Sequence, residues 1–280
     1  FKERLTENII RDVVDNRRKL TEKDVVSFRK MIARYFDVTR SQLLFSDGCL
    51  FIEGISECQL VETFSRLLGK SLIDHQIEIV DTNGTAFYQF LMLFNSSDDT
   101  KRLPLKSAFI TDQDQFTDSK ENKYNLKELV KNNYSELNSL RNNINEGEIC
   151  SRVKNMEAMA NNQKDIKICS GKKTFEYQIC LANVSADKND TKETWLYELI
   201  KKVNASGIEL VDAYMEKLCD GHMSEEEQQN VALLMWKCLP GKAGFAQELN
   251  LFLLDKIGNE VTRKFNVPSY IEEAINHLIP

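Results

Sequence analysis

Acidic side chains follow three short, largely apolar runs of this sequence. The runs are 49–52, 77–80 and 108–110, and the acids that follow them are Glu53, Asp81, and Asp112 with Asp114. If the runs are parallel strands, their carboxyl ends meet at one edge of a sheet, where ligands bind in open α/β folds. Carboxylates gathered at such an edge repel one another unless a hard divalent cation lies between them. The pattern therefore favours a magnesium site over three unrelated helix caps or solvated turns.

The elements that must position these acids alternate between strands and helices. Strands are expected over 49–52, 77–80, 108–110 and 165–169, and helices over 56–68 and 86–94. Ser56 is a candidate N-cap of the first helix, which stops at Gly69. This order predicts a right-handed parallel α/β unit. If the third strand continues past Asp112, then Asp112 and Asp114 point to the same face, because side chains alternate along a strand.

The 280 residues suggest one large or two modest domains. We expect three parts: a helical segment over 1–47, the tail end of a missing N-terminal part; a catalytic domain over 48–180 with a polar helical insertion at about 118–165; and a helical region over 181–280 that completes the site. Helices of the last part are expected at Trp195–Val203, Ser224–Leu239, Ala243–Ile257 and Pro268–Leu278. The predicted class is α/β, a parallel sheet flanked by helices with an additional, mainly helical C-terminal region.

Composition and short motifs argue against several classes of protein. The net charge of −6, from 37 Lys and Arg against 43 Asp and Glu, argues against a sequence-blind nucleic-acid coat protein. No apolar run approaches the ~18 residues of a membrane span. Seven scattered cysteines predict reduced thiols in a cytoplasmic protein, without disulfides or a zinc site. Gly69-Lys70-Ser71 has the ending of a P-loop, but Phe64 stands where that motif needs Gly, so no nucleotide is expected to bind.

Several segments carry a family resemblance in a fixed order. They are Phe51-Ile52-Glu53-Gly54-Ile55-Ser56-Glu57, then 68–72, 77–84 and 110–114, and in the tail 241–247 and 267–271. Together they resemble a Toprim domain and, more narrowly, the nuclease half of the OLD (overcoming lysogenization defect) endonucleases. The resemblance covers roughly 30–118 and 240–280. One departure is that Ala243 and Gly244 follow Lys242, where the family commonly has a Gly directly after the Lys.

The resemblance implies metal-binding roles for five acids. Glu53 would be a metal ligand and candidate general base, with Asp112 and Asp114 as further ligands. Glu57 and Glu176 would serve a second metal. Glu57 lies four residues after Glu53, close enough to face the same cavity if the helix begins near position 56.

Blander roles stay open for three of the residues that the resemblance singles out. Glu57 could instead be a first-turn acid that the helix dipole favours, and Glu176 could be a surface acid. Lys242 would stabilise charge on the phosphate or the leaving oxygen, or would be a solvated lysine near a helix start.

The function implied is a Mg²⁺-dependent DNA endonuclease, with two ions and with Mn²⁺ as a substitute. It would be the nuclease part of an ATPase–nuclease antiphage defence protein, such as the nuclease subunit of a Gabija-type system. DNA, a second copy bound through the missing ATPase portion, and a helicase-like protein are the implied partners. One alternative is a catalytically silent Toprim module that binds a helicase or regulator. The other is a topoisomerase or primase; the topoisomerase needs a nucleophilic Tyr, and Tyr88, Tyr177 and Tyr270 lack a supporting motif.

Overall fold

A computed structural model describes residues 9–11, 17–19, 21–38, 41–84, 87–96, 98–115, 127, 134–160, 163–218, 221–257 and 264–280. The strands are β1 (Ile9–Arg11), β2 (Arg17–Lys19), β3 (Gly48–Ile52), β4 (Ile77–Asp81), β5 (Lys106–Asp112) and β6 (Ile166–Gly171). The helices up to the last strand are α1 (Glu22–Val38), α2 (Ile55–Leu67), α3 (Tyr88–Leu91), α5 (Ser135–Glu146) and α6 (Ser151–Ala160). Those after it are α7 (Phe175–Ala182), α8 (Lys188–Lys192), α9 (Trp195–Val203), α10 (Ala205–Lys217), α11 (Glu225–Cys238), α12 (Lys242–Lys256) and α13 (Ser269–Leu278).

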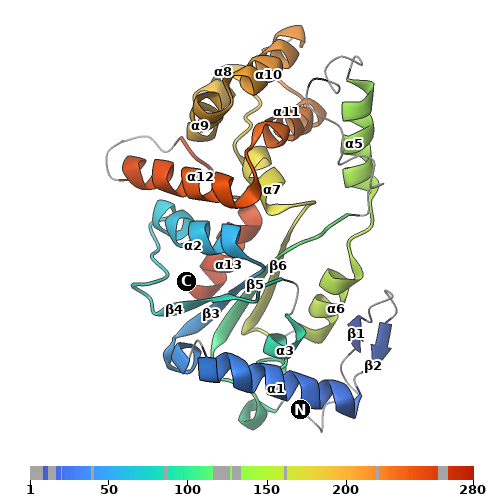
Figure 1. Ribbon diagram of the computed structural model, residues 1–280, viewed down its shortest axis with the longest axis vertical. Helices are drawn as coiled ribbons and strands as arrows, with labels where there is room; N and C mark the ends of the chain where they lie inside the picture. The colour runs from blue at the N-terminus through green and yellow to red at the C-terminus, as the bar shows by residue number, and fades with distance from the viewer. Residues whose placement is uncertain are drawn as a thin grey trace.

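Four of the described strands form a parallel sheet in the order β4-β3-β5-β6 (Figure 1). Phe51 of β3 pairs with Phe109 of β5, and Asp112 of β5 pairs with Gly171 of β6. From β3 the chain first adds β4 on one side of β3, and it then returns to add β5 and β6 on the other side. The carboxyl ends of β3 and β5 therefore flank the point where the strand order reverses, which is where α/β sheets bind ligands.

The two faces of the sheet pack against different helices because side chains alternate along each strand. Leu50, Ile52 and Ile110 belong to the core cluster that includes residues of α2, α12 and α13. Phe51 and Phe109 belong to the opposite cluster with residues of α3 and α6, and their rings stack with centroids 4.5 Å apart. Figure 1 shows α2 and α13 on one side of the sheet, α3 and α6 on the other, and α8–α11 gathered beyond its end. The predicted α/β class, with a parallel sheet and a helical C-terminal region, is confirmed.

Most predicted elements are present, with four corrections. The segment 1–47 is not helical throughout, since β1 and β2 pair as antiparallel strands before α1. The helix expected over 86–94 is confined to α3 among the described residues, and position 86 lies outside them. Helix α2 begins at Ile55 with Gly54 as N-cap, so Ser56 is not the cap but a buried first-turn residue. The polar composition of the insertion predicts exposed helices; it is helical in α5 and α6, yet α5 buries Leu137, Leu140 and Ile144, and residues 118–126 and 128–133 lie outside the described residues.

Two expectations from composition can be compared with the fold. Within the described part of the chain, no helix combines the length and the hydropathy that a membrane crossing needs. None of the six cysteines in that part forms a disulfide, and five of them are buried.

Candidate metal centre

Glu53 and the end of β5 are joined by hydrogen bonds at the carboxyl edge of the sheet. Glu53 directly follows β3, and β5 lies beside β3 in the sheet. The Oε1 atom of Glu53 accepts hydrogen bonds from the Thr111 hydroxyl and, at 3.1 Å, from the backbone N–H of Asp112. These bonds fix the carboxylate of Glu53 across the gap between two strands, although Glu53 and Asp112 are 59 residues apart in sequence.

Asp112 and Glu57 lie on the α2 side of this edge and are both buried. The pKa of Glu57 is raised to about 7, chiefly by burial; the charges of Glu53 and Glu176 add to the rise, while a backbone hydrogen bond and Lys242 oppose it. Burial likewise raises the pKa of Asp112 well above its usual range, with added effects from Glu53, Glu57, Asp114 and Glu176. The structure thus brings the acids into one electrostatically coupled cluster, in which removing water from the carboxylates is the main cause of the shifts.

Glu176 reaches the cluster from the first turn of α7. Thr174 caps this helix, because its side chain accepts a hydrogen bond from the Tyr177 N–H at 3.3 Å. Only 3% of Glu176 is exposed, and its Oε2 atom has no hydrogen-bond partner among the described residues. A buried carboxylate oxygen without a partner is costly, and the positive end of the helix dipole offsets that only in part. Glu176 is therefore not a surface acid.

Lys242 lies near Glu176 without a tight contact. It is the first residue of α12, its Nζ is 3.8 Å from Oε2 of Glu176, and its side chain is 71% exposed. An ion pair of this length, with an exposed lysine, contributes little to stability. The ammonium group stands at the rim of the acid cluster, where it can meet an incoming anion.

Arg152, which no sequence motif singles out, lies on the other side of the edge. It belongs to the first turn of α6, and its side chain is 9% exposed. Its Nη2 atom donates to Glu53 Oε1 at 2.9 Å and to Asp114 Oδ2 at 3.1 Å. Burial acts to lower the pKa of Arg152, but Glu53, Cys150 and Asp114 raise it, and the net shift is upward. The guanidinium therefore stays charged and neutralises part of the cluster.

Asp112 and Asp114 do not point to the same face. Strand β5 ends at Asp112, and Asp114 has a left-handed backbone with φ of 44°. The backbone between them is tied to β6, since the Gln113 N–H donates to the Gly171 carbonyl at 2.8 Å. Asp114 consequently turns toward Arg152 with its side chain 51% exposed, whereas Asp112 stays buried. The condition behind the same-face expectation, a strand continuing past Asp112, is not met.

Two other features at the strand ends are resolved by the fold. Asp81 accepts a hydrogen bond from the Asn83 N–H at 2.8 Å, so this acid caps the turn after β4. Tyr270 of α13 packs against Gly171 beside Asp112 and is buried with its hydroxyl unpartnered among the described residues. Desolvation and the charges of Asp112, Glu57, Glu176 and Glu53 raise the pKa of Tyr270 well above its usual range. This Tyr forms one wall of the acid cluster.

The donor set fits a hard divalent cation. All five acids offer carboxylate oxygens, which Mg²⁺ and Mn²⁺ prefer, and Glu176 contributes a buried oxygen that lacks a partner among the described residues. Within the described residues, no three His, Cys, Asp or Glu side chains already converge as a metal-binding group. Binding of a common ion by Glu57, Asp112 and Glu176 would therefore require rotations of these side chains.

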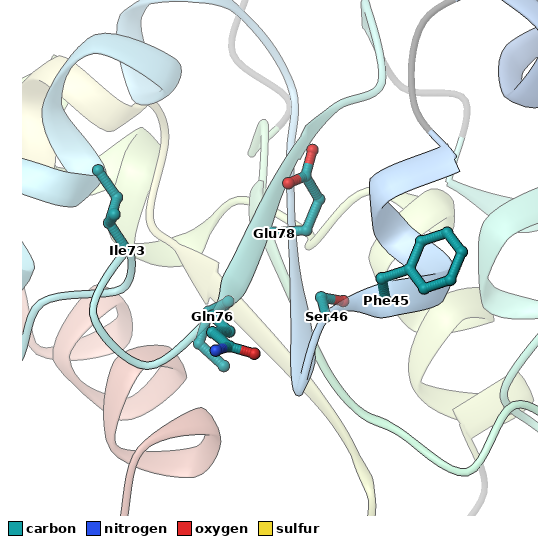
Figure 2. Close-up of a pocket in the computed structure, with 6 residues that line it drawn as sticks. Phe45, Ser46, Ile73, Gln76 and Glu78 are labelled. Carbon is teal, nitrogen blue, oxygen red and sulfur yellow. The ribbon is translucent and has the colours of Figure 1, made fainter.

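A cavity of about 310 Å³ lies elsewhere, at the amino ends of β3 and β4 (Figure 2). Phe45 and Ser46, which precede β3, line it together with Ile73 and Gln76 from the loop before β4. Figure 2 shows the side chains of five residues that line the cavity: Phe45, Ser46, Ile73, Gln76 and Glu78. Because the acids lie at the carboxyl ends of the same strands, this cavity is not part of the acid cluster.

Comparisons with known proteins found a match to one family model and a set of similar solved structures. Residues 44–114 match the overcoming lysogenization defect protein-like TOPRIM domain. The chain is similar to the C-terminal region of the Burkholderia pseudomallei OLD protein, with 16% identity, 84% of this chain and 97% of that chain covered, and a TM-score of 0.46. It is also similar to the C-terminal region of the Xanthomonas campestris pv. campestris OLD protein, with 17% identity, 85% and 94% covered, and a TM-score of 0.43.

No curated protein gave a significant match. The matched segment 44–114 holds β3, α2, β4 and β5, and with them Glu53, Glu57, Asp112 and Asp114. Over residues 44–114 the chain therefore matches the overcoming lysogenization defect protein-like TOPRIM domain, and these four acids all lie within the match.

Proposed function

We propose that this chain is a metal-dependent DNA endonuclease, the nuclease part of an ATPase–nuclease antiphage defence protein. The observation that carries the proposal is the cluster of Glu57, Asp112 and Glu176, three buried carboxylates with the charges of Glu53 and Asp114 close by. Burying several acids together is unfavourable unless a cation neutralises them. A Toprim domain of this family supports a nuclease-type module, and the acid cluster supports a metal in it.

The residues of the site have two proposed roles: some bind the metal ions, and Lys242 stabilises negative charge on the substrate. Asp112, Glu57 and Glu176 would hold divalent cations, with Mg²⁺ as the proposed ion and two as the proposed number. Bound ions of this kind supply Lewis-acid chemistry for phosphodiester hydrolysis, by activating water and by neutralising the leaving oxygen. Lys242, exposed at the rim, would meet the scissile phosphate and stabilise the negative charge that develops there.

Glu53 is the candidate general base. Its Oε1 atom is held by Thr111, by the Asp112 N–H and by Arg152, so the carboxylate has a fixed orientation. None of these bonds uses its Oε2 atom, which is available to accept a proton from water. A positioned carboxylate within reach of the attacking water is what general-base catalysis requires.

Two of the three tyrosines considered in the sequence argue against the topoisomerase alternative. Tyr177 and Tyr270 are both buried, and desolvation raises the pKa of each phenol. A buried phenol with a raised pKa is a poor nucleophile toward a phosphodiester. The acid cluster likewise argues against a silent interaction module, because such a module has no need of buried acids that repel one another.

Asp112→Asn tests the proposed function. The substitution keeps the size of the side chain and removes the charge of the acid whose pKa is raised by burial and by all four of the other acids in the cluster. With supercoiled plasmid and Mg²⁺ or Mn²⁺, we expect the parent chain to nick or cut DNA and Asp112→Asn to be slower by orders of magnitude. Asp74→Asn, in an exposed turn outside the cluster, should cut like the parent. Robust cutting by the parent in EDTA, or normal cutting by Asp112→Asn, would overturn the proposal.

A further inference from the structure

Four oxygen atoms surround one nitrogen of Arg152. Nη2 lies 2.9 Å from Glu53 Oε1, 3.0 Å from Thr111 Oγ1, 2.8 Å from the Asp112 carbonyl oxygen and 3.1 Å from Asp114 Oδ2. These oxygens come from the end of β3, from β5 and from the turn after β5, and α6 places the nitrogen among them. We refer to the four oxygens as the oxygen cage.

The oxygen cage has more acceptors than the guanidinium nitrogen can serve. One Nη atom carries two protons, so at most two of the four oxygens receive a well-directed hydrogen bond. The rest of the guanidinium is poorly matched as well, because the buried Nε of Arg152 has no hydrogen-bond partner among the described residues. Arginine binds carboxylates best as a two-pronged fork, and here a single prong meets both Glu53 and Asp114. The cage therefore suits a small spherical cation better than it suits this side chain.

We infer that Arg152 is an internal counter-cation that occupies a cation position in the oxygen cage, and that a divalent ion binding there must displace it. An ion in the cage would be bound by the Thr111 hydroxyl, the Asp112 carbonyl oxygen and the carboxylates of Glu53 and Asp114. The carboxylate of Asp112 is not part of the cage. This inference rests on the proposed function only in taking the entering ion to be Mg²⁺ or Mn²⁺.

Displacement of Arg152 has a structural route. Arg152 lies in the first turn of α6, which follows the segment Gly147–Cys150. Two contacts join this start to β5: the Cys150 N–H donates to the Gln113 carbonyl at 3.0 Å, and the Cys150 thiol lies 3.9 Å from the Asp112 carbonyl. The backbone can stay in place while the long arginine side chain rotates away, because its rotatable bonds lie beyond the anchored helix start.

Metal affinity of the full chain tests the inference by a readout other than cleavage. Arg152→Gln removes the positive charge and keeps a polar side chain, so calorimetric titration with Mn²⁺ should show binding at least ~10-fold tighter than in the parent. Arg152→Lys keeps the charge and should stay close to the parent. Arg102→Gln is the matched control, since Arg102 also pairs with two acids, Asp99 at 2.9 Å and Asp165 at 3.3 Å, outside the cluster. It should leave Mn²⁺ affinity unchanged.

Stability without metal gives the second expected result. In EDTA, Arg152→Gln should melt at a lower temperature than the parent, because Glu53 and Asp114 lose their counter-charge. Saturating Mn²⁺ should raise its melting temperature by more than it raises that of the parent. The inference would be overturned if Arg152→Gln bound Mn²⁺ no more tightly than the parent does. It would also be overturned if Arg152→Lys bound Mn²⁺ as tightly as Arg152→Gln does.

A measurement on the parent chain covers the case in which Arg152→Gln does not fold. Arginine side-chain ¹⁵N resonances, assigned by their loss in Arg152→Lys and Arg102→Gln, should respond to diamagnetic Mg²⁺ at Arg152 and not at Arg102. A silent Arg152 resonance under saturating Mg²⁺ would overturn the inference. Absence of cleavage with the expected order of affinities would overturn the proposed function alone, whereas cleavage with unchanged affinities would overturn the inference alone.

Discussion

Gly171 and Tyr270 lie in such close contact that a Cβ atom on Gly171 would come within 2.8 Å of Cζ of Tyr270. Gly171 is the last residue of β6 and pairs with Asp112 of β5. Tyr270 lies on α13, which packs across β5 and β6. The absence of a side chain at position 171 therefore lets α13 place its Tyr ring directly beside the acid cluster.

Gly171→Ala should destabilise the chain and displace Tyr270. The new methyl group would also lie 2.9 Å from Gln178 Cγ, so the ring has little room to yield. Overpacking of this kind costs about 1–3 kcal/mol, which thermal or urea unfolding in EDTA can measure. Gly221→Ala is the control, because a Cβ atom there meets nothing within 4 Å. Equal stability of Gly171→Ala and the parent would mean that the ring is not held against β6.

Stability without metal should fall as the pH rises from about 5 to 8. The pKa of Glu57 is about 7 in the folded chain against an ordinary 4.5, so the folded state binds its proton more tightly than the unfolded state does. The stabilisation is fully present below the unfolded pKa and is lost as the pH rises through the folded pKa, with about 3 kcal/mol at most at stake. Asp112, whose pKa is also raised, acts in the same direction.

Glu57→Gln should flatten this pH dependence. The amide has no proton to lose, so melting temperatures in EDTA should change less between pH 5 and pH 8 than in the parent. Glu209→Gln, an exposed position on α10, should keep the slope of the parent. A parent that becomes more stable with rising pH over this range would contradict the assignment of Glu57 as a buried, proton-retaining acid.

Lys242→Ala should separate catalysis from metal binding. Because Lys242 is 71% exposed and lies 3.8 Å from Glu176, its loss should change stability and Mn²⁺ affinity little. If it stabilises charge in the transition state, single-turnover cleavage should slow roughly 10²-fold. Lys264→Ala removes a similarly loose ion pair, 3.9 Å from Glu193, and should cleave normally. Cleavage by Lys242→Ala at the parental rate would leave this lysine as a solvated surface residue.

The sequence by itself determined the sheet and the carboxyl edge. Runs such as Cys49–Ile52 are buried on both faces, and such strands are recognisable because every side chain in them is apolar. Helix α9 has the predicted bounds, Trp195 and Val203, and in the structure the Thr194 side chain caps its start. Acids that follow parallel strands must meet at one edge, so the order of strands and acids along the chain is enough to place Glu53 and Asp112 together.

Only the tertiary structure decided which acids are buried together, which of them turns away, and which cationic side chain neutralises part of their charge. Arg152 lies 40 positions after Asp112 in a polar stretch, and no local pattern distinguishes it from a solvated arginine. Its role depends on long-range contacts: α6 packs against β6, and the start of α6 is hydrogen-bonded to the residues at the end of β5. The turn of Asp114 away from Asp112 depends likewise on a backbone hydrogen bond from Gln113 to Gly171 of β6. Spacing along a chain specifies faces only while the strand continues, and where it ends the neighbouring elements set the direction of each side chain.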